Sequence, residues 1–561
     1  MVLAFEFEYL SQNRVLENIL KSLCDRFSIR YSLSRNDSIV TLLVDDTKER
    51  LGEFSDYLAE NLPLSIFFKS SSVKVVENFS DGNVLVSRCD LALPFTKLAY
   101  TLAKDKESKY YLNPFTPNEI GLTCKELDKC SLELLIKGEV YKGESYEDIY
   151  KKVASLIKDD KVVKIKTPNG MFAFGKIDDS KVKLKGEFEV IPTDYSLIRK
   201  MVVLQENEMI ALASLEKPII EAKLNLVFEA KSVFDSNRVD IRLPNNLLLQ
   251  FICEELYKAG VEFIFKASAL DFGNEYLLNY NINTPEVNDI KIVVLENSEI
   301  LIKKGDGYAS KRLKEKLKKL NNPSFSQFAS VLKERNLFDE KVSGFYFSKD
   351  SDDAIMFYSE KDWIVPLVKF PVYKSVQDIF KAIEESSPSG EKLIKNYKKT
   401  YPKLYENAFF AKIPENLPNN IYTVLGFVSL ILGFSEKFEG AAERIIEFAE
   451  DFGGQKGPRI DSYLQDREKI NSDFNTLKFI QSTISFKLAG VDELTLSFGM
   501  LESLSYFISD MADAHSENFG SKKVALCGMM FGSKRFAEIV CKNLLSNHKV
   551  YFNRELPIDN I

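Results

Sequence analysis

The residues whose pattern best fits phosphate chemistry lie near the end of the sequence, in the stretch VALCGMMFGSKRF (524–536). Apolar residues lead to Gly528, and a second glycine and a basic stretch follow. This pattern predicts a buried strand, a turn and a helix, a junction at which glycines let the backbone approach a phosphate. The glycine spacing matches neither the Walker nor the Rossmann fingerprint. Met529 and Met530 add bulk where a phosphate would lie, so a core strand and turn explain the stretch as well.

Two further stretches could contact a nucleotide. In KTPNG, Lys166 precedes a glycine turn and could grip a phosphate, although an ordinary hairpin turn explains the same spacing. In FEGAAERIIEF, Glu439 and Gly440 open a predicted helix, where the carboxylate could take a ribose hydroxyl. Acidic residues at helix starts and alanines in helix packing are also common without any ligand.

The cysteines and histidines argue against a metal centre. The seven cysteines are scattered and form no CxxC pair, which is typical of reduced cytosolic thiols. The two histidines, His515 and His548, lie far apart in the sequence, which argues against a histidine-rich metal site. Cys527 could be a nucleophile, but we expect a buried structural cysteine there.

The elements that would position these residues follow from the hydrophobic periodicity. Residues 1–80 read as strand, helix, strand, helix, strand, which predicts a small split-βαβ unit. From about residue 140, a helix, a strand, the KTPNG turn and another strand open a new domain. The segment NNPS (321–324) is the clearest linker, and three strands followed mostly by helices come after it.

Length and composition exclude several classes of protein. A chain of 561 residues is too long for one hydrophobic core, so about three or four domains are expected. A net charge of −7 argues against a general nucleic-acid-binding protein. No apolar run reaches the roughly 18 residues that span a bilayer, and MVLAFEFEYL has acidic residues where a signal peptide needs basic ones. We therefore expect a cytoplasmic protein with no membrane insertion and no nucleic-acid partner.

Taken in order, these stretches resemble the hydrogenase-maturation carbamoyltransferase HypF over nearly the whole chain. The resemblance implies a multidomain α+β and α/β fold made of four parts. These are an acylphosphatase-like (ferredoxin-like) domain at 1–80, a degenerate zinc-finger segment at 81–138, a YrdC-like domain at 139–322, and a Kae1-like ASKHA domain, truncated at the C-terminus, at 323–561.

In the first two parts, several groups of the family pattern are missing. Arg14 stands where the family has its phosphate-binding arginine, and Asn36 could stand for the family's asparagine. The loop before that arginine is YLSQN, without the glycines that form an anion nest. In the second part, YYLNPFTPN resembles the family's RRYPF signature, but only Cys89 and Cys124 correspond to zinc ligands. The resemblance implies Arg14 and Asn36 as candidate phosphate-binding residues and the loss of zinc.

In the YrdC-like part, Lys166 corresponds to the family's lysine-glycine turn. Of the expected Thr-Ser-Gly/Ala-Asn only Ser268 is in place. The resemblance therefore implies Lys166 and Ser268 as candidate nucleotide contacts.

In the Kae1-like part, Glu439 and Gly440 match the family's Glu-Gly helix, and Gly528 matches the strand–turn–helix usually written VALSGGVFQN. Asp559 stands for a metal-binding aspartate, but the histidine pair that holds this metal in the family has no counterpart. The resemblance implies Glu439, Gly440, Gly528 and Asp559 as further candidate nucleotide contacts. It assigns no catalytic and no metal-binding residue.

Within this family, the chain resembles most the accessory proteins of membrane-bound NiFe hydrogenases, in length and in its Lys-, Phe- and Tyr-rich composition. Losses in separate domains favour a non-catalytic scaffold that binds a NiFe hydrogenase subunit or another maturation factor. Two alternatives stay open. One is an ATP-dependent carbamoyltransferase with altered site residues, and the other is a nucleotide-binding regulator without turnover. ATP is thus a candidate ligand, and the balance is against an enzyme.

Overall fold

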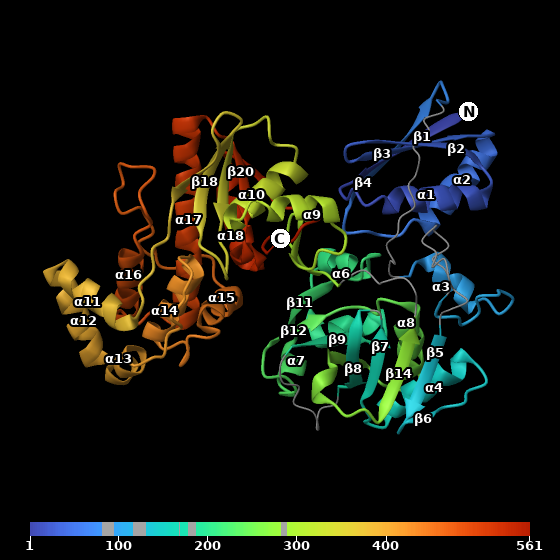
Figure 1. Ribbon diagram of the computed structural model, residues 1–561, viewed down its shortest axis with the longest axis horizontal. Helices are drawn as coiled ribbons and strands as arrows, with labels where there is room; N and C mark the ends of the chain where they lie inside the picture. Colours follow the sequence, from blue (N-terminus) through green and yellow to red (C-terminus); the bar gives the residue numbers. More distant parts are fainter. Residues whose placement is uncertain (81–94, 116–130, 168, 178–186, 282–288, 561) are drawn as a thin grey trace. The chain divides into compact units, whose positions relative to one another are not determined.

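The computed structural model describes residues 1–80, 95–115, 131–167, 169–177, 187–281 and 289–560 (Figure 1). The chain forms two compact units. The first contains Met1–Val294 and Gly305–Ser310, and the second contains Leu295–Lys304 and Lys311–Ile561. Both combine β-sheet with helices, so the chain has the multidomain α+β and α/β fold that the sequence predicted.

The first unit begins with a four-stranded antiparallel sheet of strand order β2-β3-β1-β4. Two helices lie on one face of this sheet (Figure 1). The sequence predicted three strands in this region, and that number is wrong. The strand β2 was not predicted, because it has too few apolar residues for a clear alternating pattern. The resulting βαββαβ order is ferredoxin-like. The elements are β1 (Val2–Tyr9), α1 (Val15–Phe27), β2 (Arg30–Asn36), β3 (Ile39–Asp45), α2 (Lys48–Asn61) and β4 (Phe68–Val76).

Alternation of side chains in β1 builds the core of this sheet. Phe5 and Phe7 are buried, and they pair across the ladder with Leu42 and Val40 of β3. Glu6, between the two phenylalanines, faces the opposite side of the sheet and pairs with Lys74 of β4 in a surface salt bridge. The core therefore fixes the end of β1 beside the end of β2 and the start of α1.

A larger mixed sheet forms most of the rest of the first unit. Its strands run in the order β15-β11-β12-β9-β13-β8-β7-β14-β5-β6, with β10 paired to β11. The helices α4 (Tyr146–Lys158) and α8 (Leu247–Lys258) contribute apolar residues to its core. The strands are β5 (Ser131–Ile136), β6 (Glu139–Val140), β7 (Val163–Thr167), β8 (Gly170–Lys176), β9 (Phe188–Pro192), β10 (Val202–Val203), β11 (Ile219–Leu224), β12 (Arg238–Ile241), β13 (Phe263–Ser268), β14 (Tyr276–Asn281) and β15 (Lys291–Val294). Short helices α5 (Ile198–Met201), α6 (Glu206–Ala213) and α7 (Leu226–Glu229) connect some of them.

The segment expected to derive from a zinc finger is described only in part. Cys89 and Cys124 lie outside the described residues, so the expected loss of zinc stays a prediction. The helix α3 (Lys97–Lys104) and the residues up to Phe115 are described. Phe115 stacks on Tyr280 of β14 with 5.3 Å between ring centroids, which attaches this segment to the larger sheet.

The second unit contains a five-stranded sheet of order β19-β18-β17-β20-β21. The strands β17, β20 and β21 are parallel, and β18 and β19 are added in antiparallel fashion. The long helix α17 lies next to this sheet (red in Figure 1). The strands of this sheet are β17 (Val342–Tyr346), β18 (Ala354–Ser359), β19 (Trp363–Val368), β20 (Lys523–Cys527) and β21 (Lys549–Tyr551). The unit also contains the strand β16 (Ile300–Lys304), which is not part of this sheet. The helices are α9 (Lys311–Lys318), α10 (Pro323–Glu334), α11 (Val376–Ser386), α12 (Pro388–Thr400), α13 (Pro402–Phe409), α14 (Ile421–Leu432), α15 (Ala441–Asp451), α16 (Thr476–Leu488), α17 (Glu493–Phe519) and α18 (Lys534–Leu544).

The most apolar helix, α14, is an internal element of the second unit. It has 12 residues, nearly all of them buried, and Gly433 ends it in the left-handed conformation. Across the described parts of the chain, we find no helix with the length and apolar character needed to cross a bilayer.

Candidate functional site

Two arginines surround one buried carboxylate at the start of α1. The side chain of Glu17 is 1% exposed, and its Oε1 atom lies 3.0 Å from Nη1 of Arg14 and 2.9 Å from Nη1 of Arg35. Glu17 sits in the first turn of the helix, where a negative charge is also favoured by the helix dipole. The chain's own carboxylate therefore occupies the position between the two guanidinium groups.

Backbone carbonyls hold Arg35 in place independently of Glu17. Its Nη2 atom donates to the carbonyl oxygens of Tyr9 at 2.9 Å and Ser11 at 2.7 Å, and its Nε atom donates to that of Asp37 at 2.8 Å. The side chain is 4% exposed, whereas that of Arg14 is 39% exposed. Arg35 is thus a fixed donor, and Arg14 is an accessible one.

The structure places the two predicted phosphate-binding residues differently. Arg14 lies at the N-terminal end of α1, as expected, and contacts Glu17. Asn36 is exposed at the end of β2. Side chains alternate along a strand, so Arg35 and not Asn36 turns towards Arg14. Arg35 and Glu17 were not predicted from the sequence, because their proximity depends on the position of β2, a strand that the sequence pattern does not indicate.

Lys166 and Ser268 lie at one end of the larger sheet. Lys166 of β7 pairs with Met171 of β8, and Ser268 of β13 pairs with the next residue, Phe172. Both are exposed, and the Ser268 hydroxyl accepts a hydrogen bond from the Leu270 amide at 3.4 Å. Because successive residues of β8 face opposite sides of the sheet, Lys166 and Ser268 lie near the same end of the sheet but on opposite faces. Their nucleotide role stays a prediction.

A compensated ion cluster lies in the same sheet. Lys266 Nζ contacts both oxygens of Glu189 at 3.1 and 3.2 Å and Oδ2 of Asp289 at 2.8 Å. Arg242, which is 2% exposed, contacts Oδ2 of Asp289 at 2.7 Å and Oε2 of Glu189 at 3.3 Å. Burial raises the pKa of Asp289, but the charges of Arg242 and Lys266 outweigh this effect and lower it well below its usual range. Two cations and two carboxylates thus neutralise each other.

In the second unit, Asp559 accepts hydrogen bonds on both of its oxygens. Tyr346 Oη and the Asn560 amide donate to Oδ1 at 2.9 Å each. Ser348 Oγ and the Met529 amide donate to Oδ2 at 2.8 and 3.0 Å. A carboxylate has about four acceptor positions, so these four donors from the chain itself fill them. Burial raises the pKa of this carboxyl group, and the four hydrogen bonds oppose that rise.

The predicted strand, turn and helix at 524–536 are present as β20, a 3₁₀ turn at Met529–Gly532 and α18. Gly528 has φ 105°, and its amide donates to the carbonyl of Ile558. Met530 is buried in the core, and the Met529 amide, which a phosphate loop would offer to its ligand, donates to Asp559 instead. Gly528 thus contacts Ile558, which precedes Asp559, and Asp559 contacts Met529, which follows Gly528. The two predicted residues therefore lie close together.

Glu439 and Gly440 lie elsewhere in the second unit. Both are exposed, and Gly440 is the N-cap residue that precedes α15, with φ 75°. Glu439 lines an open pocket of about 990 Å³ together with Phe410 and Lys412. Among the described residues, the hydrogen-bond donors to Asp559 include neither of them. The contact between α15 and the start of α18 is made by Glu450, whose Oε1 accepts from Ser533 at 2.8 Å.

Two of the buried residues of this unit, Cys527 and His515, have structural surroundings. Cys527 is fully buried, and burial raises the pKa of its thiol well above the usual value, so it stays protonated. His515 is also buried, its Nδ1 lies 3.0 Å from Ser343 Oγ, and burial lowers its pKa to about 4. Among the residues that the structure describes, no three metal-ligating side chains cluster.

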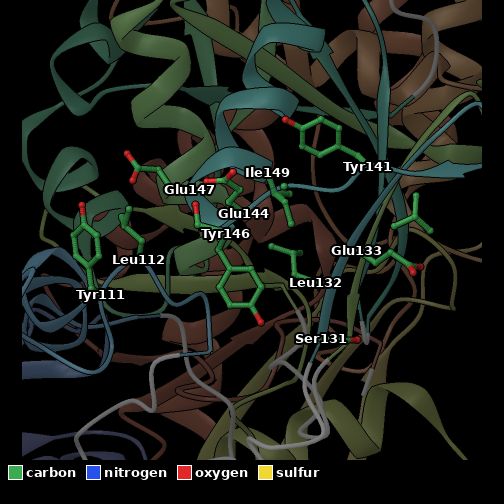
Figure 2. Close-up of a pocket in the computed structure, with 13 residues that line it drawn as sticks. Tyr111, Leu112, Ser131, Leu132, Glu133, Tyr141, Glu144, Tyr146, Glu147 and Ile149 are labelled. Carbon is green, nitrogen blue, oxygen red and sulfur yellow. The ribbon is translucent and has the colours of Figure 1, made fainter.

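Another pocket, of about 730 Å³, lies in the first unit between β5 and the start of α4 (Figure 2). Tyr111, Tyr146 and Glu133 are among its lining residues. None of the residues predicted from the sequence as site residues lines it.

The comparisons with known proteins agree with this architecture. Protein HydE of Wolinella succinogenes is 26% identical over 575 aligned positions, which cover 100% of both chains. A crystal structure of full-length HypF in the phosphate- and nucleotide-bound form has a TM-score of 0.64 at 13% identity, covering 100% of this chain and 96% of its own. The crystal structure of T. kodakarensis HypF has a TM-score of 0.68 at 12% identity, covering 99% and 96%. No family model matches the chain. The chain is thus a HypF-like protein in fold and is related in sequence to Protein HydE.

Proposed function

We propose that this chain is an accessory protein of NiFe-hydrogenase maturation that acts by binding and not by catalysis. Its partner in this proposal is a hydrogenase subunit or another maturation factor. The fold of HypF and the full-length similarity to HydE support the link to hydrogenase maturation.

One observation carries the non-catalytic part of the proposal. At two of the predicted ligand sites, the donors are held by the chain's own carboxylates: Glu17 binds Arg14, and Asp559 binds the Met529 amide. A phosphate arriving at either place would meet a fixed negative charge instead of a set of unoccupied donors. Catalysis by phosphate or carbamoyl transfer needs preorganised donors aimed at the developing charge. Occupied donors at two separate places therefore argue against transfer from site to site.

The test combines binding with function in the native host. A tagged chain should capture a hydrogenase subunit or a hydrogenase-maturation factor, and a strain without the chain should lose hydrogenase activity. Lys166→Ala and Ser268→Ala remove the exposed nucleotide candidates of the larger sheet with little risk to folding. If the chain acts by binding, both variants restore hydrogenase activity as well as the unaltered chain. If either variant still captures the partner but fails to restore activity, the alternative of a carbamoyltransferase is favoured.

One observation favours a nucleotide-binding regulator as the second candidate. Lys166 and Ser268 are exposed near the same end of the sheet, and because their rows face opposite sides of it, a ligand could contact both only by lying across the strand ends. Such a regulator would be stabilised against heat by ATP without forming a product. The same two variants would abolish that stabilisation.

A further inference from the structure

We propose that Lys217 is a nucleophilic lysine that forms an imine with a small, uncharged aldehyde or ketone. Lys217 lines a pocket of about 250 Å³ in the first unit, and this pocket holds the carbonyl compound. The pocket lies at the opposite end of the larger sheet from Ser268, which ends β13, because its residue Pro192 pairs with Phe263 at the start of β13. The inference goes beyond the proposed function and holds whichever partner the chain binds.

The first argument is that the amine of Lys217 has few partners. Its Nζ atom donates to the carbonyl oxygen of Ala213 at 3.0 Å and lies 5.6 Å from the ring centroid of Phe95, which also lines the pocket. Within the described part of the chain, no carboxylate forms an ion pair with this nitrogen. Burial lowers the pKa of Lys217 to about 8, and the charge of the neighbouring Glu216 only partly opposes this effect. The unprotonated amine, which is the nucleophile, is therefore populated near pH 8.

The second argument is that the backbone at Lys217 is strained and held in place. Its φ of 46° lies in the left-handed region, although it precedes Pro218, and a residue before proline favours extended conformations. Its amide donates to the carbonyl oxygen of Ser214 at 3.1 Å, and its own carbonyl oxygen accepts from Nη2 of Arg242, also at 3.1 Å. Strain that the surrounding contacts maintain is typical of functional sites.

The third argument is that the pocket fits a small ligand with an apolar body. Phe95, Leu243 and Tyr257 supply apolar surface, and the volume is below the range of about 300 to 1,000 Å³ that is usual for pockets of drug-sized ligands. Asp194 also lines the pocket. It accepts hydrogen bonds from Ser196 and has no salt-bridge partner among the residues that the structure describes. Its charge disfavours an anionic ligand and favours the positively charged iminium form of the adduct.

The reaction is balanced by the release of one water molecule. The lone pair of Nζ attacks the carbonyl carbon, and the π electrons of the C=O bond move to the oxygen. Both protons of the amine pass to this oxygen, the C–O bond breaks, water leaves, and a C=N bond joins Nζ to the ligand. Hydrolysis reverses these steps, and nothing is oxidised or reduced.

A purely structural lysine at this position would act only as a helix cap. Ala213 is the last residue of α6, and a cation beside its carbonyl group stabilises the end of the helix. In that case the amine would stay protonated and react no faster than other lysines. Lys258 is a matched comparison, because it lines the same pocket but its Nζ contacts Oε1 of Glu255 at 2.5 Å, and this hydrogen bond raises its pKa.

The experiment treats the full-length chain at pH 8 with benzaldehyde and cyanoborohydride, which converts an imine into a stable amine. Peptide mass spectrometry measures the labelling rate at each lysine over a range of aldehyde concentrations. Lys217→Arg keeps a cation beside Ala213, and its loss of the label identifies the labelled site. 4-Carboxybenzaldehyde serves as the anionic probe of similar size.

We expect benzaldehyde to label Lys217 at least about tenfold faster than Lys258, because a pKa more than one unit lower gives more than tenfold more neutral amine. The rate at Lys217 should level off as the concentration rises, as it does when binding precedes reaction, whereas the rate at Lys258 should rise in proportion. The anionic aldehyde should prefer Lys217 less strongly than benzaldehyde does.

Three results would overturn the inference. The first is labelling of Lys217 that is no faster than that of Lys258, which a helix cap alone would give. The second is a rate at Lys217 that stays proportional to the benzaldehyde concentration, as for an accessible amine without a binding site. The third is a preference of the anionic aldehyde for Lys217 that equals or exceeds that of benzaldehyde.

Discussion

Two glycines from the predicted site, Gly528 and Gly440, provide a matched pair of substitutions. Both have positive φ, 105° and 75°, and both were candidate ligand contacts. They differ in their surroundings. A Cβ atom at Gly528 would lie 2.2 Å from the carbonyl oxygen and 2.4 Å from the carbonyl carbon of Phe347, whereas at Gly440 it would meet nothing within 4 Å. We therefore expect Gly528→Ala and Gly440→Ala to differ strongly in their effect on stability.

The magnitude follows from backbone strain and steric overlap. For Gly440→Ala, the left-handed conformation alone costs about 1 to 2 kcal/mol. For Gly528→Ala, the backbone lies in a region essentially restricted to glycine, which costs about 1 to 3 kcal/mol. The overlap is with backbone atoms, which cannot rotate away, and displacing a packed segment costs about 1 to 3 kcal/mol more. The sum for Gly528→Ala is about 2 to 6 kcal/mol.

The assay is guanidinium unfolding followed by tryptophan fluorescence. Trp363 is the single tryptophan of the chain, and it lies in β19, in the same sheet as β20. Its emission therefore reports on the second unit and avoids mixing the transitions of the two units. Gly528→Ala should lower the free energy of unfolding by about 2 kcal/mol more than Gly440→Ala does. We reason that Gly528 is required by packing against Phe347 and the C-terminal segment, and not by a ligand. Equal effects of the two variants would refute this reasoning.

The remaining predictions concern two buried titratable groups. Burial lowers the pKa of His515 from 6.5 to about 4, so the neutral side chain stabilises the folded state. This stabilisation is lost as the pH falls through that range, and the unfolding free energy of the second unit should then drop by about 3 kcal/mol. His515→Phe should remove this part of the pH dependence, and an unchanged acid profile would contradict it. The oxygens of Glu216 accept hydrogen bonds from Ser65 Oγ at 2.6 Å and from the Ile66 amide at 3.0 Å. Burial raises the pKa of Glu216, so the contribution of this carboxyl group to stability falls as the pH rises above the usual glutamate range. At pH 8, we expect thermal unfolding to show that Glu216→Gln is at least as stable as the unaltered chain. Glu216→Ala should be about 2 kcal/mol less stable than the unaltered chain, because the Ile66 amide loses its acceptor. The reverse order of stability would contradict this account.

Strong periodicity made much of the fold predictable. The strand β1 and the helix α4 both appear where the sequence indicated. The strand β2 was not predicted, because its polar residues pack at an edge of the sheet and carry little alternation. Tertiary pairing with β3, which a local pattern does not contain, determines that strand.

The candidate site was predictable only in part, for the same reason. Gly528 and Asp559 were placed by motif, and the fold brings them together. Glu17 and Arg35 were missed, because 18 positions separate them and only the pairing of β2 brings them into contact. A search for a buried acidic residue in the first turn of an amphipathic helix could have drawn attention to Glu17. No local signal identifies its partner.

The central claim is that this HypF-like chain has kept the architecture and not the chemistry. The most direct test incubates the full-length chain with ATP, Mg²⁺ and carbamoyl phosphate and measures AMP, with an active HypF as the positive control. The account predicts no AMP above the protein-free blank. Formation of AMP that depends on carbamoyl phosphate would contradict it.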